Sequence, residues 1–469
     1  MRLIKMTKSL SKNNFTEGPL LLPILKYSIP IILSGLLQMC YNMADNIIVG
    51  KFSGDEFALA AVGATGELTR LIINLLMGIG AGAGIIVAQS YGAGDEKKLS
   101  KSVHTAITFS SFAGIAFAFL FFFISGPALK LMGINPDFIA LSILYMKITA
   151  FGIPALAVFN YVSSILRCVG DSRTPLVILS ISGITNVGLN LVFVIGCGMS
   201  VDGVALATVV SQYISAVISV IVIIKRKGTP YSFSFKKMGI DVSLLKLSLI
   251  LGIPQAIENS TRNLANVLLV SSMNTFDGYT FTAYTINCQL QSILDSVCTG
   301  FILAATVFTA QNYGAKNLAR VKKVLSTSII LVIASALLTS AVTLVFQEPL
   351  TLLFMPENST NEQTILAVAR SLNFLVLGTY FLMGILGVLS GSLRGLGRSV
   401  MQSVLFLTGL CGTRILWIFA VFPFIKTPVG LMTCFPVSWT VAIILIGTAR
   451  LKVGKKLKKV NTEVASSTD

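Results

Sequence analysis

The sequence predicts an all-α membrane protein with 12 transmembrane helices in two pseudo-symmetric six-helix lobes. Three observations predict this fold class. The 469 residues are 54% hydrophobic and 12% charged, whereas a soluble chain carries roughly 25% charged residues. Apolar runs long enough to cross a bilayer recur along the chain, and the second half repeats motifs of the first half. Strands are not expected, because the runs are long and show no sustained alternation.

Each predicted span rests on its apolar length. A transmembrane helix needs about 20 mainly apolar residues, and twelve runs meet that requirement. Some contain proline (Pro30, Pro154 and Pro254), which membrane helices tolerate when neighbours satisfy the freed backbone groups. In order, the runs cover residues 24–50, 58–90, 101–125, 138–166, 174–197, 203–224, 244–271, 280–310, 325–347, 364–393, 400–424 and 428–449.

Basic residues set the predicted orientation, because cytoplasmic loops carry an excess of Lys and Arg. With the N-terminus inside, most of the 36 Lys and Arg residues fall in the two tails and the inside loops, one of which carries Arg394 and Arg398. Three fall in outside loops: Lys51, Lys130 and Lys426. We therefore expect a multi-pass plasma-membrane protein with both termini in the cytoplasm. The net charge of +17 has the same origin, so no nucleic-acid partner is expected.

The two halves of the chain form a tandem repeat. Three pairs of segments resemble each other at offsets near 222: Val87–Gly94 with Thr309–Lys316, Leu166–Gly170 with Leu393–Gly397, and Leu25–Ser28 with Leu245–Ser248. Six spans per repeat give the halves parallel orientation, an architecture of secondary transporters. The predicted organisation is a cytoplasmic segment at 1–23, an N-lobe at 24–224, an inter-lobe linker at 225–243, a C-lobe at 244–449 and a basic cytoplasmic tail at 450–469.

Charged residues within the spans are the first functional candidates. Each costs roughly 2.5–3.5 kcal/mol or more against lipid at mid-depth, so these side chains should face a cavity or pair with one another. Some of them can instead snorkel to the interface or form purely structural pairs. The nine are Asp45, Glu67, Arg70, Lys147, Glu258, Arg262, Asp295, Arg370 and Arg414.

Asp45 is the sharpest candidate for an ion site. Gln38, Tyr41, Asn42 and Asp45 share one face of the first span at helical spacing, and that face is too polar for lipid. A carboxylate there can bind a proton or Na⁺, and a purely structural hydrogen bond to a neighbouring span is the alternative. Neutral oxygens that could join the site are found in the fifth and sixth spans, on Asn186, Asn190 and Thr208.

A second polar cavity is expected in the C-lobe. Glu258 and Arg262 form an i,i+4 pair with the acid first. Asn287, Gln291 and Asp295 step along one face of the eighth span. An internally neutralised ion-pair network is the alternative interpretation of these five residues.

Other motifs indicate packing rather than chemistry. Gly78, Gly80, Gly82 and Gly84 lie inside a span without the ending of a phosphate loop, so close helix packing is expected. Gly387, Gly391 and Gly395 fit small-xxx-small packing. The chain has no Walker motif, CxxC pair, metal cluster or catalytic triad. We therefore expect no enzyme activity, no cofactor beyond a coupling H⁺ or Na⁺, and transport driven by an ion gradient.

Several motifs together resemble the multidrug and toxic compound extrusion (MATE) transporters, with the bacterial DinF-like and MepA-like branches most similar. The resemblance covers about residues 20–450 and rests on the order and spacing of its motifs. These are Leu25-Lys-x-Ser-Ile-Pro30, Tyr41-Asn-Met-Ala-Asp45, Ala60-Ala-Val-Gly63, Ala88-Gln-x-Tyr-Gly-Ala93 and the Leu-Arg-x-x-Gly motif of each repeat.

The resemblance implies an antiporter that exports cationic or amphipathic drugs in exchange for H⁺ or Na⁺ and acts as a monomer among membrane lipids. It also implies an ion site at Asp45, Asn186, position 190 and Thr208. The DinF-like branch has an Asp at the third position, where this chain has Asn190. One carboxylate is therefore missing, which favours H⁺ over Na⁺. Glu258 follows Pro254 too closely to match the span 7 glutamate of the NorM-like branch, so that role is not carried over.

Two other functions remain open from the sequence. A lipid-linked oligosaccharide flippase of the same superfamily would favour a cationic cavity, and five basic residues against four acidic ones within the spans agree with it. Such flippases often have 14 spans rather than 12. A membrane enzyme or receptor is disfavoured by the tandem repeat, which suits alternating access.

Overall fold

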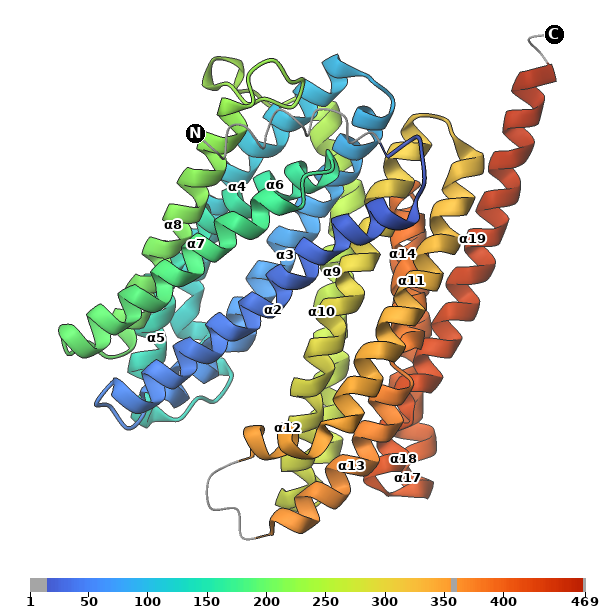
Figure 1. The fold of residues 1–469 in the computed structure, drawn as a ribbon. Coiled ribbons are helices and arrows are strands. Elements are labelled where there is room, and N and C mark those ends of the chain that lie inside the picture. The colour runs from blue at the N-terminus through green and yellow to red at the C-terminus, as the bar shows by residue number, and fades with distance from the viewer. Residues whose placement is uncertain (1–14, 356–360, 467–469) are drawn as a thin grey trace. The chain divides into compact units, whose positions relative to one another are not determined.

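The described residues of this computed structural model are 15–355 and 361–466, except for the side chains of Glu67, Leu264 and residues 458–466. The first part of the predicted cytoplasmic segment and the end of the predicted tail lie outside these residues. Within them the chain is α-helical without strands, which confirms the all-α class. Figure 1 shows the helices in chain order.

The described chain separates into two compact units, Leu33–Ala256 and Phe15–Ile32 with Ile257 onward. Each unit therefore includes the beginning of the first helix of the other repeat: residues 242–256 of the second repeat belong to the first unit, and residues 21–32 of the first repeat belong to the second unit. The predicted lobes were continuous in sequence, so this exchange was not foreseen. Residues 226–241, which lie between helices α8 and α9, contain only a short 3-10 turn at Phe235–Lys237.

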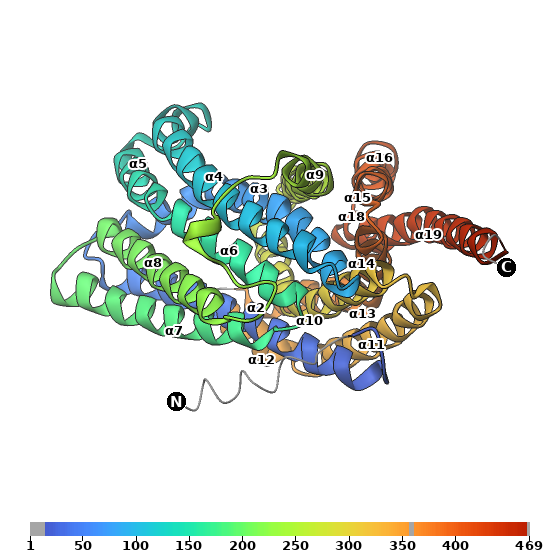
Figure 2. The same cartoon turned by 90° about the horizontal axis from the view of Figure 1, so that it is seen from above.

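The first unit contains α2 (Leu21–Phe52) from Leu33 onward and α9 (Val242–Met273) up to Ala256. Between them it contains α3 (Ala58–Gly92), α4 (Glu96–Leu131), α5 (Pro136–Ala150), α6 (Ile153–Cys168), α7 (Arg173–Asn190), the π-helical segment η2 (Leu191–Gly196) and α8 (Val201–Lys225). Helix α3 packs against α4, α5 and α6, and α8 packs against α5, α6 and α7. Figure 2 shows α7 and α8 side by side.

The second unit contains α10 (Gly278–Gly314), α11 (Leu318–Val345), α12 (Gln347–Phe354), α13 (Glu362–Gly378), α14 (Phe381–Gly395), α15 (Ser399–Phe406), η4 (Leu407–Gly412), α16 (Thr413–Leu416), η5 (Trp417–Val421), α17 (Phe422–Ile425), α18 (Pro428–Met432) and α19 (Cys434–Ser466). Helix α10 packs against α11, α13 and α14, and α14 packs against α19 (Figures 1 and 2).

The predicted spans agree closely with the helices. Ten described helices are long and apolar enough to cross a membrane, and the α5–α6 pair, bent by 50°, is an eleventh candidate. Helix α9 covers the remaining predicted run at 244–271 but is not among these candidates. A multi-span helical membrane protein is confirmed, and the count of 12 stays a prediction.

The alternate glycines of α3 pack on two neighbours, as expected. A Cβ on Gly78 would lie 2.6 Å from the backbone of Ala256 in α9. A Cβ on Gly84 would lie 2.6 Å from the Ser164 side chain in α6. Glycines two positions apart face opposite sides of a helix, so this run lets α3 approach both partners closely. In the second unit, Gly395 of α14 is as tightly packed against α10, where its Cβ would meet the Thr306 carbonyl oxygen at 2.6 Å.

Equivalent turns of the two repeats have the same backbone geometry. Asp95 caps α4 by accepting the Lys98 N–H at 2.9 Å, and Asn317 caps α11 by accepting the Arg320 N–H at 3.2 Å. The residue before each cap is left-handed, with φ of 68° at Gly94 and 57° at Lys316. The sequence repeat therefore corresponds to a structural repeat.

Candidate functional site

Asp45 and Asn190 meet inside the first unit. The Nδ2 atom of Asn190 donates a hydrogen bond to Oδ1 of Asp45 at 2.5 Å. Asn190 is completely buried and Asp45 is half-buried. Asn190 is the last residue of α7, and the π-helical segment η2 begins at the next position. Such segments are rare and frequently lie at functional sites.

Tyr41 holds α2 close to α7 one turn before Asp45. Its hydroxyl donates to the Ser180 carbonyl oxygen at 3.4 Å. Its ring lies against Gly183, where an added Cβ would be 1.9 Å from the ring. Only glycine leaves room for the tyrosine in this geometry, so the α2–α7 approach that joins Asp45 to Asn190 depends on Gly183.

The other predicted residues of the first unit form no hydrogen bond to Asp45 among the described residues. Gln38 donates to Asn42 at 3.3 Å, and both are exposed. Asn186 is buried on α7. The Thr208 hydroxyl donates to the carbonyl oxygen of Val204 in its own helix at 2.9 Å. Among the described residues, neither Asn186 nor Thr208 forms a hydrogen bond to Asp45.

Two features of the Asp45 site were not apparent from the sequence. The Oδ1 atom of Asn190 is buried without a hydrogen-bond partner in the described part of the chain. Tyr145 of α5 lies within electrostatic range of Asp45. A tyrosine in the middle of an apolar run gives no signal that distinguishes a site from ordinary packing.

The polar face of α10 forms hydrogen bonds to α13 and to the turn between α13 and α14. Gln291 donates to Asn287 at 2.6 Å, and Asn287 donates to Asn373 of α13 at 2.8 Å. The Tyr380 hydroxyl donates to Asp295 at 3.2 Å. Gln291, Asn287 and Asn373 thus form one chain of hydrogen bonds, and Asp295 has a separate partner in Tyr380.

The expected pairing of Glu258 with Arg262 was wrong. Glu258 accepts a hydrogen bond from Ser403 at 2.9 Å and lies 3.8 Å from Arg394. Arg394, which the sequence placed in an inside loop, belongs to the last turn of α14, with its side chain 11% exposed. Arg262 forms no hydrogen bond or ion pair with another described residue. The buried carboxylate of Glu258 has its partners on other helices, so it does not pair with Arg262 one turn along its own helix.

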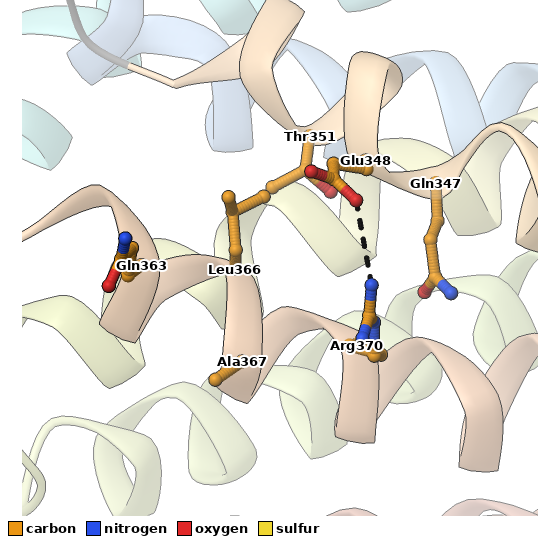
Figure 3. A pocket seen from close by; sticks show the side chains of 7 residues that line it. All are labelled: Gln347, Glu348, Thr351, Gln363, Leu366, Ala367 and Arg370. Carbon is orange, nitrogen blue, oxygen red and sulfur yellow. Dashed lines mark hydrogen bonds and ion pairs between the residues drawn. The ribbon is translucent and has the colours of Figure 1, made fainter.

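Figure 3 shows a separate pocket between α12 and α13, where Arg370 and Glu348 point toward each other at 3.5 Å. Their side chains are 67% and 58% exposed, and an exposed pair contributes little stability. Of the nine charged residues that the sequence placed within spans, Arg370 lines this pocket, and none of the residues predicted for the ion site or the second polar cavity does. Arg370 is an exposed residue in the middle of α13, within the stretch Glu362–Gly395 that is long and apolar enough to cross a membrane.

The described residues contain no group of three or more His, Cys, Asp or Glu side chains that could hold a metal ion. The Asp45 site offers one carboxylate and one amide oxygen. A proton needs only the carboxylate, whereas Na⁺ would need further oxygens.

A family model described as MatE matches residues 30–192 and 254–420. The chain belongs to the MatE family. The two matched stretches begin at Pro30 and Pro254 and follow the two repeats. The MatE family comprises multi-span membrane transporters of the multidrug efflux type, so this chain is a membrane transporter of that type. Membership does not favour the flippase alternative.

Individual MatE relatives cover nearly the whole chain. Probable multidrug resistance protein YoeA of Bacillus subtilis is 28% identical over 430 residues, which are 90% of this chain and 91% of that protein. Multidrug export protein MepA of Staphylococcus aureus is 22% identical over 82% of this chain and 83% of its own length. A solved outward-facing multidrug resistance MATE transporter has a TM-score of 0.87 at 21% identity, over 96% and 99% of the two chains, which confirms the fold.

Proposed function

We propose that this chain is a proton-coupled antiporter that exports small organic compounds from the cytoplasm by alternating access. It binds no organic cofactor, catalyses no covalent reaction and works as a monomer in the plasma membrane. Both termini face the cytoplasm, as the distribution of Lys and Arg indicates. YoeA and MepA are named for multidrug resistance or export, which agrees with small organic substrates.

The observation that carries the proposal is the Asp45–Asn190 hydrogen bond. When Asp45 is charged, its oxygen accepts from the amide NH₂ of Asn190. When Asp45 is protonated, its O–H can donate to the amide oxygen after the Asn190 side chain turns over, since the two ends of an amide are nearly isosteric. The unpartnered Oδ1 of Asn190 is then satisfied. Proton binding thus reverses the direction of the hydrogen bond.

The absence of a second carboxylate at position 190 argues for H⁺ over Na⁺. Moving a cation out of water carries a large dehydration cost, which opposite charges and oxygen ligands must offset. Asp45 supplies one negative charge, and Asn190 supplies a neutral oxygen. Neutralising a single carboxylate by a proton leaves no net charge in the low-dielectric interior, so the empty and loaded forms differ by one charge. That difference can bias two conformations of a transporter.

Accumulation of fluorescent compounds in everted membrane vesicles tests the function. Respiring vesicles that contain the chain should take up small organic dyes such as rhodamine 123 or carboxyfluorescein. Vesicles that contain Asp45→Asn at equal protein level should not. A protonophore should stop the uptake, and removal of Na⁺ should not. Wild-type uptake that survives the protonophore, or no uptake of any dye above empty-vector vesicles, contradicts the proposal.

A further inference from the structure

The second unit contains more buried positive charge than its acids neutralise. Arg262, Arg394 and Arg414 lie in one polar region. Arg262 is within electrostatic range of the other two arginines. The acids of this region are Glu258 and Asp295. Three guanidinium groups against two carboxylates leave one positive charge in excess.

Arg414 has only neutral partners among the described residues. Its Nε donates to the Ser438 hydroxyl at 3.3 Å and its Nη1 donates to the Asn266 side-chain oxygen at 3.0 Å. The guanidinium carbon stands over the Phe435 ring, 4.2 Å from its centre. Arg414 is 4% exposed, and no described carboxylate lies within 4 Å of it. The charge of Arg414 is therefore stabilised by neutral hydrogen-bond acceptors and by the face of an aromatic ring, without a counter-ion among the described residues.

The acids of this region are already engaged. Glu258 pairs with Arg394 and accepts a hydrogen bond from the Ser403 hydroxyl. Asp295 accepts the Tyr380 hydroxyl. Arg262 is half-buried and lies within electrostatic range of Tyr380, yet it has no hydrogen-bond or ion-pair partner in the described chain. Two of the three arginines are thus without a carboxylate partner.

An arginine buried in a membrane protein without an anion is costly, because desolvation of the charge is not offset by a nearby opposite charge. Guanidinium groups match carboxylates and phosphates geometrically and bind them in bidentate fashion. We propose that Arg262, Arg394 and Arg414 form a binding site for the anionic group of the exported compound. The group is a carboxylate, sulfonate or phosphate, so the substrates include organic anions. This inference rests on the proposed export function and names the substrate class.

The two repeats carry opposite charges at corresponding helices. Pro30 and Pro254 are 224 positions apart, and so are Asn190 and Arg414. In the first unit the first and fifth spans of the repeat are joined by Asp45 and Asn190. In the second unit the same two spans of the repeat are joined by Asn266 and Arg414.

In the first unit this contact joins an acid to an amide, and in the second unit it joins an amide to an arginine. The fold places a π-helical segment beside it in both units, η2 after Asn190 and η4 and η5 around α16, which carries Arg414. We assign the cation-binding role to the first unit and the anion-binding role to the second. Proton and substrate then need not compete for one carboxylate.

Equilibrium dye binding to the purified full-length chain in neutral detergent tests the site without any gradient. Carboxyfluorescein is an anion and rhodamine 123 is a cation, and they share a xanthene core. Fluorescence anisotropy should show binding of carboxyfluorescein to the wild type. Arg262→Gln and Arg414→Gln should each weaken that binding at least about tenfold, the loss expected on removing a charge-assisted hydrogen bond. Neither substitution should weaken rhodamine 123 binding.

Matched controls keep the test specific. Arg370→Gln removes an exposed arginine of the same unit and should leave carboxyfluorescein binding unchanged. Arg262 is half-buried, so Arg262→Gln should fold even if Arg414→Gln does not, as size-exclusion chromatography will show. Competition by phosphatidylglycerol in nanodiscs identifies the natural source of the anionic group. Displacement that depends on Arg262 points to a lipid headgroup, and lack of displacement points to a soluble solute. The first outcome would overturn the assignment of the site to an exported solute, and the second supports it.

Two further results would overturn the inference. One is the absence of arginine-dependent binding of both carboxyfluorescein and phosphatidylglycerol. The other is weakening of carboxyfluorescein binding by Arg370→Gln to the same extent as by Arg262→Gln, which would indicate a non-specific charge effect. Proton-driven uptake of rhodamine 123 in vesicles would stand in either case. The failure of this inference is therefore distinguishable from failure of the proposed function.

Discussion

The amide nitrogen of Asn190 donates to the carboxylate of Asp45 across 2.5 Å, between helices α7 and α2. Residues 145 positions apart in the sequence thus form one polar unit in an apolar interior. The contact leaves the Asn190 oxygen buried and unpartnered. Asp45 has one neutral hydrogen-bond partner, and the unpartnered oxygen of that partner can accept a hydrogen bond from the O–H of protonated Asp45. This arrangement is suited to binding and releasing a proton.

Asn190→Asp should change the ion requirement. A second carboxylate beside Asp45 adds the negative charge that a dehydrated Na⁺ lacks in the wild type. We expect transport by this variant to be stimulated several-fold by Na⁺, whereas wild-type transport is insensitive to it. Uptake in everted vesicles over a Na⁺ series measures the difference. Na⁺ stimulation of the wild type, or its absence in the variant, would count against the role assigned to position 190.

Gly183→Ala should disturb the Asp45 site through Tyr41. The new Cβ would lie 1.9 Å from the Tyr41 ring, so α2 and α7 must separate, at a cost of about 1–3 kcal/mol for overpacking. Lower transport and a lower melting temperature are expected. Gly188→Ala on the same helix is the control, because a Cβ there meets nothing within 4 Å. Equal effects of the two substitutions would show that the close approach does not matter.

Lys316→Gly should stabilise the protein. Lys316 has φ of 57°, a conformation that glycine adopts without the cost that a Cβ imposes. The expected gain is about 1 kcal/mol, and Gly94→Ala at the equivalent turn should lose a similar amount. Thermal unfolding of the purified protein in detergent checks both. A melting temperature for Lys316→Gly at or below that of the wild type would show that the turn is not strained.

The ion pair of Asp171 with Arg226 should contribute far more stability than the one between Lys101 and Asp241. The first pair is 4% and 8% exposed, and Asp171 also accepts the Thr174 N–H at 3.0 Å. Breaking a buried pair leaves an uncompensated charge and costs about 3–5 kcal/mol. Asp171→Asn should therefore lower the unfolding temperature strongly. The Lys101 side chain is 66% exposed, so Lys101→Gln should cost less than about 1 kcal/mol. Similar unfolding temperatures for the two variants would contradict this ranking.

The sequence predicted the features that local composition determines. Apolar length located the spans, and helical spacing together with the family resemblance singled out Asp45 and Asn190. The sequence did not predict features that depend on contacts between distant segments. The partner of Glu258 is Arg394 rather than Arg262, because an i,i+4 rule considers one helix alone. Tyr145 was overlooked because nothing in its own span distinguishes it from packing residues.

The count of spans is a further difference. Apolar length predicted a span at 244–271, where α9 lies, but α9 is not among the ten described helices that are long and apolar enough to cross a membrane. The exchange of the first half-helices between the two units has no local signal, since it depends on which distant helices pack together.

Proton movement through the Asp45 site can be measured in proteoliposomes that contain only the purified chain, a pH indicator and Na⁺-free buffer. A compound shown to be transported in vesicles is added on one side under an imposed pH gradient. We expect wild-type liposomes to exchange the compound for protons, and Asp45→Asn liposomes with equal protein content to do neither. Substrate transport without proton movement in the wild type, or unchanged coupled exchange in Asp45→Asn, would contradict proton coupling at Asp45.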